Sequence, residues 1–292
     1  MPRPSPQPTA AAPEDRLAGR ADRADPAGEP VPLPRPAAPG GVVVVVPAYN
    51  AEHTLAELVD SIPVGCCDEI VVVDDGSGDA TAAVARRLAA RLPLTVIVHP
   101  ENRGYGANQK TCYREALDRG AGLVVMLHAD GQYDARLIPA AVQVLRAGVC
   151  DVVLGNRIRT RGEALAGGMP WVKYLANRAL TLIENVLSGQ NLGEWHSGFR
   201  AYRREVLEIC PFERNSDDFV FDSQLLVQAV HFGFRLGDVP MPVRYFEEAS
   251  SIGFRRASRY ALATLVTFGS WLAHRTRVRR SRRFEPRAAA TD

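Results

Sequence analysis

Acidic side chains follow two apolar runs of the sequence. Asp74 and Asp75 come directly after residues 69–73, and Asp130 comes soon after residues 123–127. Apolar runs that are rich in Val and close with Asp and Gly are typical of parallel strands covered on both faces. Because ligands of open α/β sheets bind at the carboxyl edge of such strands, the three carboxylates predict a polar, metal-assisted site there.

The elements that position these carboxylates alternate between strand and helix. Strands are expected at residues 42–46, 69–74, 94–98, 123–127 and 151–154. Helices are expected at residues 52–61 after an Asn50 cap, up to residue 92 after a cap at Asp79 or Ser77, and at 106–119, 135–146, 171–187 and 218–232. Such βα repeats require right-handed crossovers, so the predicted class is α/β with a mostly parallel sheet.

Composition is that of an ordinary globular chain. The 292 residues are 46% hydrophobic and 23% charged, and the net charge of +2 is too small to indicate nucleic-acid binding. Five cysteines form an odd set without a CxxC pair or metal-finger spacing, which favours reduced structural thiols and a cytoplasmic protein.

Both ends of the chain differ from the predicted catalytic domain at residues 41–253. Residues 1–40 hold eleven of the 21 prolines and few large apolar side chains, so a disordered tail without a secretory signal is expected. Residues 254–292 combine an apolar stretch at 260–274, too short to span a bilayer, with seven arginines between Arg275 and Arg287.

That C-terminal pattern predicts an amphipathic helix in peripheral contact with a membrane. The side chains expected at the acyl boundary are Leu262, Leu265, Val266, Trp271 and Leu272. The alternatives are that this helix packs on the catalytic domain and that the basic tail is only solvated.

Four motifs occur in series, at residues 46–52 (VPAYNAE), 73–77 (VDDGS), 102–106 (NRGYG) and 197–202 (SGFRAY). In this order and spacing the chain resembles the family-2 glycosyltransferases, nearest to the branch of dolichyl- or polyprenyl-phosphate mannose synthases, over about residues 42–253. The resemblance implies a GT-A fold, that of nucleotide-diphospho-sugar transferases, with a mostly parallel central sheet flanked by helices.

The resemblance also implies a divalent metal, Mn²⁺ or Mg²⁺, beside the donor diphosphate. The family's Asp-x-Asp, followed two residues later by Gln, corresponds here to His128, Asp130 and Gln132, so the first acid is missing. Imidazole suits Mn²⁺ better than Mg²⁺, so His128 either shifts the metal preference or leaves the coordination sphere and only hydrogen-bonds a loop. Asp130 is the firmest metal candidate and is also counted as catalytic.

The donor is expected to bind along the first two strands. By resemblance Pro47, Tyr49, Glu52 and Asp75 contact the base and ribose, and Asp74 lies beside them at the strand end. The alternative for both aspartates is turn formation. Gly104 and Gly106 would let the start of a helix approach the nucleotide closely. These glycines form no dinucleotide-binding fingerprint, which disfavours NAD.

Further catalytic candidates lie in the second half of the chain. Arg157 corresponds to an arginine that faces the diphosphate or the acceptor phosphate, and Arg200 belongs to the Ser-Gly-Phe-Arg motif. Asp222 is a candidate base or a simple helix-surface acid. The family's late serine-lysine pair is replaced by Ser250 and Ser251.

These features predict transfer of a sugar from a GDP- or UDP-sugar, with inversion as the resemblance implies, to a polyprenyl phosphate or another lipid-linked acceptor. A lipid phosphate needs no strong base, because its second pKa is about 6. The alternatives are transfer to a glycan or small-molecule hydroxyl and a nucleotide-binding scaffold without turnover. The expected location is the cytoplasm, with peripheral attachment to the inner face of the cytoplasmic membrane.

Overall fold

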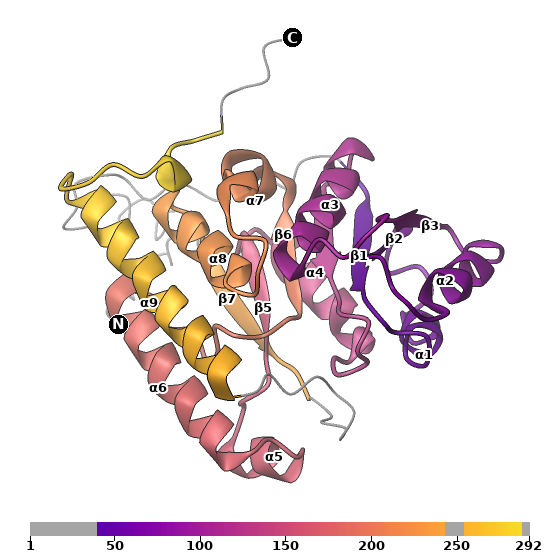
Figure 1. The fold of residues 1–292 in the computed structure, drawn as a ribbon, viewed down its shortest axis with the longest axis horizontal. Helices are drawn as coiled ribbons and strands as arrows, with labels where there is room; N and C mark the ends of the chain where they lie inside the picture. Colours follow the sequence, from indigo (N-terminus) through magenta and orange to yellow (C-terminus); the bar gives the residue numbers. More distant parts are fainter. Residues whose placement is uncertain (1–39, 243–253, 288–292) are drawn as a thin grey trace, which may run out of the picture. The chain divides into compact units, whose positions relative to one another are not determined.

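The computed structural model describes residues 40–242 and 254–287. They form one seven-stranded sheet in the order β3-β2-β1-β4-β6-β5-β7 (Figure 1). The strands are β1 Val42–Ala48, β2 Glu69–Asp74, β3 Leu94–Val98, β4 Leu123–Met126, β5 Val152–Asn156, β6 Arg200–Arg203 and β7 Leu236–Pro240. Only β6 is antiparallel to its neighbours within this described sheet, which confirms the predicted mostly parallel arrangement.

Helices cover both faces of the sheet. They are α1 Leu55–Asp60, α2 Thr81–Ala89, α3 Tyr105–Asp118, α4 Ile138–Arg146, α5 Arg161–Ala166, α6 Trp171–Ser188, α7 Arg204–Ile209, α8 Phe221–His231 and α9 Phe254–Arg275. Short 3₁₀ turns lie at η3 Ala135–Leu137, η4 Phe212–Arg214 and η5 Arg282–Phe284.

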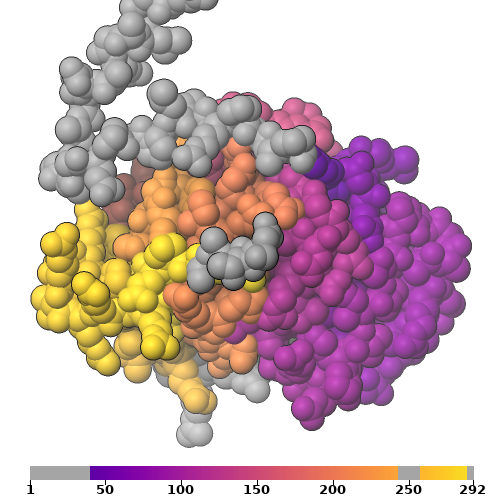
Figure 2. Space-filling view, turned by 90° about the horizontal axis from the view of Figure 1, so that it is seen from above, coloured from indigo at the N-terminus to yellow at the C-terminus, as the bar shows by residue number. Residues whose placement is uncertain are grey.

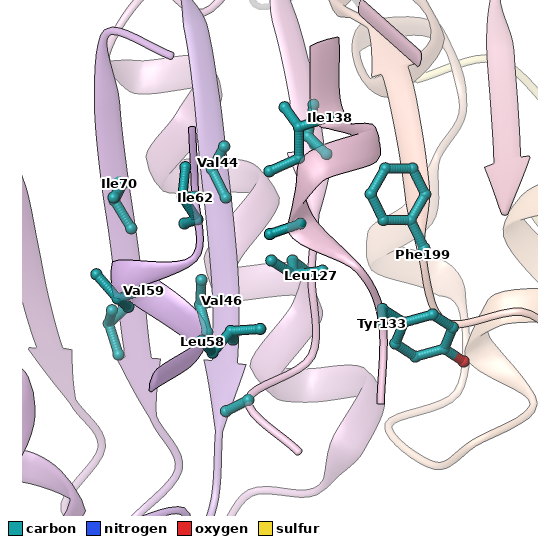
Figure 3. Packing of buried hydrophobic residues seen from close by; sticks show 14 of the residues in the cluster. Val44, Val46, Leu58, Val59, Ile62, Ile70, Leu127, Tyr133, Ile138 and Phe199 are labelled. Atoms are coloured by element: carbon teal, nitrogen blue, oxygen red, sulfur yellow. The ribbon is translucent and has the colours of Figure 1, made fainter. Parts of the chain in front are cut away.

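Strand β1 shows how two cores arise from one run of valines. Val44 and Val46 face a cluster with α1, α2 and α4, whereas Val43 and Val45 face a cluster with α3, α7, α8 and α9. Side chains alternate between the faces of a strand, so a strand covered on both faces needs apolar residues at every position. Figure 3 follows the first cluster from Val46 and Leu58 to Leu127.

The predicted first helix begins too early. Residue Asn50 does not cap it: α1 starts at Leu55 with Thr54 in the cap position. Asn50 instead has a φ of 50° and accepts a hydrogen bond from the backbone N–H of Gly78, 3.1 Å away. Its side chain therefore joins two loops at the carboxyl edge of the sheet.

Helix α9 lies against α8 and α6 (Figure 1). Trp271 is buried and Leu272 half-buried in the second core, so these two side chains do not belong to an outer face, contrary to the sequence prediction. Leu262, Leu265 and Val266 are exposed as expected. The following segment lies on the surface near η4 (yellow in Figure 2), where Arg214 donates a hydrogen bond to the carbonyl oxygen of Glu285.

Two predictions fall outside the described residues. They concern the tail at residues 1–39 and the pair Ser250 and Ser251. None of the described helices is long and apolar enough to cross a membrane. All five cysteines are free thiols.

Candidate functional site

Three strands bring the predicted site residues to one edge of the sheet. Strand β1 pairs in parallel with β2 on one side and β4 on the other. Asp74 ends β2, the segment from His128 to Gln132 follows β4, and Arg157 follows β5. The carboxyl ends of these strands meet where open α/β sheets bind ligands.

The carboxylate of Asp75 is buried and organises the loop after β3. It accepts hydrogen bonds from His99 Nδ1 at 2.7 Å, from the backbone N–H of Arg103 at 3.0 Å and from that of Gly104 at 2.9 Å. Three such bonds use most of a carboxylate's acceptor capacity. In the structure the carboxylate of Asp75 thus holds the loop of the 102–106 motif in place.

Asp74 forms a tight turn, as its alternative interpretation held. Its carboxylate accepts hydrogen bonds from both the hydroxyl and the backbone N–H of Ser77, the latter at 3.2 Å. Glu52 accepts one from the backbone N–H of Ala80 at 2.9 Å. These contacts join the loops after β1 and β2 into one wall.

Two other residues predicted to contact the nucleotide of the sugar donor lie in and directly after β1. Pro47 is buried within β1, whereas Tyr49 is 52% exposed at the rim. An exposed aromatic ring at the edge of a polar loop offers a stacking surface for a nucleobase.

Gly104 and Gly106 make room for the chain itself. A Cβ at Gly106 would lie 2.4 Å from the carbonyl oxygen of Ser216, and one at Gly104 would lie 2.7 Å from that of Asp217. The backbone N–H of Gly106 donates to the same Asp217 oxygen at 2.7 Å. The approach to a nucleotide that the sequence predicted for these glycines stays a prediction, and in the structure the two glycines accommodate the segment before α8.

His128 is part of a hydrogen-bonded row across the site. Its Nε2 lies 3.0 Å from the hydroxyl of Tyr105, which donates to Asp222 Oδ2 at 2.7 Å. Burial, and then the charge of Asp222, raises the pKa of Tyr105, so the phenol keeps its proton. Because that proton goes to Asp222, His128 donates from Nε2 and keeps Nδ1 as its acceptor.

The ring of His128 fits into space left by Gly198. A Cβ at that glycine would lie 2.3 Å from the Cδ2 atom of His128. Burial lowers the pKa of His128, although the nearby Asp130 acts in the opposite direction. The imidazole is therefore neutral at pH 7, and its Nδ1 is the nitrogen left for a metal or water.

Asp130 offers the carboxylate most suited to a cation. It accepts a hydrogen bond from the backbone N–H of Gln132 at 3.0 Å, and no ion pair joins it in the part of the chain that the structure describes. Across residues 40–242 and 254–287, no group of three or more His, Cys, Asp or Glu side chains gathers around a metal position. A cation bound at Asp130 would therefore have to take most of its ligands from substrate oxygens and water.

Arg157 is held by a buried acid, Glu194. Its guanidinium donates to Glu194 Oε1, with the Nε contact at 2.8 Å, and its backbone N–H donates to Oε2 at 2.8 Å. Asn177 of α6 donates to Oε1 at 2.9 Å. Burial alone would raise the pKa of Glu194, but the charge of Arg157 and these hydrogen bonds lower it.

Arg200 lies inside the protein rather than at the rim. It is fully buried and donates to the carbonyl oxygens of Ser197 at 2.9 Å and Asp222 at 3.0 Å. The Asp222 carboxylate is 3.5 Å from the same guanidinium and also accepts a hydrogen bond from Gln109 at 3.1 Å. This geometry suits Arg200 for positioning residues 195–200. Asp222 accepts hydrogen bonds from Tyr105 and Gln109 and lies beside Arg200, so it is suited to orienting these side chains.

A cavity of about 240 Å³ opens beside Arg157 at the ends of β5 and β7. Its lining combines charge with apolar surface and consists of Arg157, Arg159, Glu163, Pro240, Met241 and Pro242. Such a mixture suits a ligand with a phosphate and an apolar chain.

Sequence reasoning missed three residues of this site. Tyr105 and Glu194 form the contacts described above, and His196 links the site to α9 through its Nδ1, 2.9 Å from the hydroxyl of Tyr260. Tyr105 lies in the 102–106 motif, which was the available signal. Glu194 could have been found from its place in the sequence, because it is an acidic residue three positions before the Ser-Gly-Phe-Arg motif that begins at Ser197.

Comparison with known proteins gives the following matches. The model of the family described as Glycosyl transferase family 2 matches residues 43–210. A polyprenol monophosphomannose synthase of Mycolicibacterium smegmatis is 30% identical over 203 residues, which are 68% of the chain and 76% of that protein. A UDP-N-acetylglucosamine–dolichyl-phosphate N-acetylglucosaminyltransferase of Methanococcus voltae is 26% identical over 225 residues, covering 73% of the chain and 89% of that protein.

Solved structures agree on the fold. Glucosyl-3-phosphoglycerate synthase of Mycobacterium tuberculosis, in complex with Mn²⁺, uridine diphosphate and phosphoglyceric acid, aligns with a TM-score of 0.58. The alignment covers 79% of the chain and 78% of that structure at 21% sequence identity. At this identity the likeness establishes the shared architecture.

Proposed function

Because the chain belongs to glycosyl transferase family 2, we propose that it transfers a sugar from a nucleotide-sugar donor to a polyprenyl or dolichyl phosphate. It is a glycosyltransferase with a GT-A fold. The lipid-phosphate acceptor is supported by the relatives named for such substrates and by the cavity beside Arg157.

The observation that carries the proposal is the position of Asp130. It follows the central strand β4, and no ion pair among the described residues competes for its carboxylate. We infer that Asp130 holds a divalent cation, with Gln132 and Nδ1 of His128 as further candidates. When bound, the cation offsets the charge that develops on the departing nucleoside diphosphate.

The donor nucleotide would lie along the wall after β1 and β2. Tyr49 supplies an exposed ring for the base. The loop that carries Asp75 lies beside it, because the backbone N–H of Asp75 donates to the carbonyl oxygen of Ala48 at 2.9 Å. The transfer assay below compares donors with guanine and with uracil as the base.

The acceptor phosphate would enter beside Arg157 and Arg159. Arg159 is exposed on the cavity wall, whereas Arg157 presents a guanidinium already oriented by Glu194. A phosphate monoester is largely ionised at pH 7, so its oxygen attacks without a strong general base. This fits an Asp222 whose oxygens are occupied by Tyr105 and Gln109. One in-line displacement then gives inversion.

The test is a transfer assay with radiolabelled GDP-mannose, UDP-glucose and UDP-N-acetylglucosamine, each with polyprenyl phosphate, in Mg²⁺ and in Mn²⁺. We expect a labelled product that extracts into butanol, and loss of that product by at least ~100-fold in Asp130→Asn. The matched control is Asp60→Asn, a surface aspartate paired with Arg91 at 2.6 Å, which should transfer normally.

Two results would contradict the proposal. In parallel reactions that offer a sugar or phosphoglycerate hydroxyl as the acceptor, product there but none with lipid phosphate would support the alternative hydroxyl acceptor. Near-normal transfer by Asp130→Asn would remove the metal role.

We further propose that the enzyme works at the cytoplasmic face of a membrane. The arginines after α9 support this location, because anionic lipid attracts each arginine near the surface by about 1 kcal/mol.

A further inference from the structure

Helix α6 exposes its apolar side chains and buries its polar ones. Its outward side carries large apolar residues, with Trp171 61% and Val186 73% exposed. The exposed apolar set on this helix is Trp171, Val172, Leu175, Ala176, Ala179, Leu182, Ile183 and Val186. At 100° per residue these positions fall on one continuous face.

The side of α6 that faces the protein is polar. Asn177, Thr181 and Glu184 are its buried residues. Asn177 donates to Glu194, and a Glu184 oxygen lies 3.0 Å from His196 Nε2. A helix that rests on a protein core and faces water has the opposite arrangement.

Helix α9, which contacts α6, also carries exposed apolar side chains, Leu262, Leu265 and Val266. On α6 alone the exposed apolar residues form one continuous face, and an exposed apolar face of this kind marks an interaction site.

The charge of the segment that follows α9 indicates the occupant. The chain leaves α9 through exposed arginines at 275, 277, 279, 280 and 282. Apolar side chains flanked by arginines suit a bilayer with anionic headgroups, in which the apolar residues enter the acyl boundary and the arginines meet phosphate.

We propose that the outer face of α6, together with α9, is the surface by which this enzyme lies on an anionic lipid bilayer. The purpose of this surface, access to a lipid acceptor, rests on the proposed function. The evidence for the surface, exposed apolar residues and arginines, does not. Helix α6 has 18 residues and is about 27 Å long, and because its apolar residues lie on one side it would lie along the bilayer plane.

The polar inner face then connects the lipid surface to the phosphate site. Asn177 donates to Glu194, which in turn accepts from Arg157, so two side-chain contacts connect α6 to Arg157. The helix that would lie on the bilayer is thus coupled to the guanidinium proposed to bind the acceptor phosphate.

The test is sedimentation of the full chain with vesicles of phosphatidylcholine alone and with phosphatidylglycerol added. The variant is Leu182→Gln/Ile183→Gln/Val186→Gln. The matched control is Val64→Gln/Val149→Gln, which changes exposed valines elsewhere on the molecule. We expect the wild type and the control to bind anionic vesicles, and the α6 variant to bind at least tenfold more weakly with an unchanged thermal melting temperature.

Equal vesicle binding by the α6 variant would overturn the inference. So would a dimer in sedimentation velocity that the α6 variant dissociates, because the face would then be a contact between two copies. A melting temperature lowered by the outward substitutions would also overturn it, since the face would then be packed inside the protein.

Transfer assays separate this inference from the proposed function. In detergent with a short-chain polyprenyl phosphate, the α6 variant should keep the wild-type rate, and with long-chain acceptor in vesicles it should lose at least tenfold. Vesicle binding by a wild type that transfers to neither acceptor would support the surface while refuting the acceptor.

Discussion

The buried pair of Arg157 and Glu194 allows a quantitative test of how the site is held. We consider Arg157→Met, Glu194→Gln and the double variant. The two side chains are 6% and 0% exposed, so each single variant leaves the other partner with an unmatched group in the interior. Breaking a buried pair in this way costs about 3 to 5 kcal/mol.

The expected size of the effect follows from these contacts. In Glu194→Gln the new amide N–H₂ would face one of the N–H donors of Arg157, whose backbone and guanidinium bonds are lost in part. A loss of ~3 kcal/mol corresponds to a melting temperature lower by roughly 6 to 12 °C for a domain of this size. The double variant removes both charges, so it should be less damaged than the sum of the single variants by about 2 kcal/mol or more.

Chemical denaturation of the full chain, followed by circular dichroism, measures these free energies. The exposed pair Arg159 and Glu163 is the matched control, because it lies two residues further along and joins the same types of side chain. Its variants Arg159→Met and Glu163→Gln should leave the midpoint almost unchanged. Additivity of the Arg157 and Glu194 variants within about 0.5 kcal/mol would refute the pairing.

Two further predictions follow from particular contacts. The pKa of Glu194 is lowered in the folded protein, so its stabilising contribution is present above the ordinary glutamate pKa of about 4.3 and is lost as the pH falls through the folded value. Denaturation midpoints between pH 7 and pH 3 should therefore fall less steeply in Glu194→Gln than in the wild type, and equal slopes would contradict this. Gly106→Ala places a methyl group against the Ser216 carbonyl and should cost ~1 to 3 kcal/mol, whereas Gly78→Ala, with open space around it, should cost less than Gly106→Ala. Equal midpoints for the two alanine variants would show that the segment at 216–217 moves away freely.

The first half of the fold was predictable because its signals are local. Strands β2 and β3 have the predicted boundaries, since each is a short apolar run between turn residues. Strand β6 was missed because its four residues, Arg-Ala-Tyr-Arg, lack an apolar run. Its two arginines are buried with acidic partners that include the distant Asp222 and Asp151. Strand β7 contains Gly237 and Asp238, which weaken any strand signal.

The site was predictable in its location but less so in its contacts. The edge of the sheet follows from the order of strands and helices, and Asp74, Asp130 and Arg157 do lie at or just after the ends of β2, β4 and β5, whereas their roles there stay predictions. The partner of Arg157 is 37 residues away, and that of Tyr105 is 117 residues away. No local pattern encodes such pairs, because they depend on how loops close over the sheet.

The replacement of the first metal-loop acid by His128 has a structural consequence at the glycine opposite. An aspartate at that position would be shorter than the imidazole, which fills the space over Gly198 and reaches Tyr105. The chain thus exchanges a negative charge for a neutral side chain fixed through Tyr105 to Asp222. With one carboxylate fewer, a cation held at Asp130 as proposed would depend more on the diphosphate of the donor itself. Calorimetric titration should therefore show that metal and nucleotide sugar bind together more tightly than either does alone.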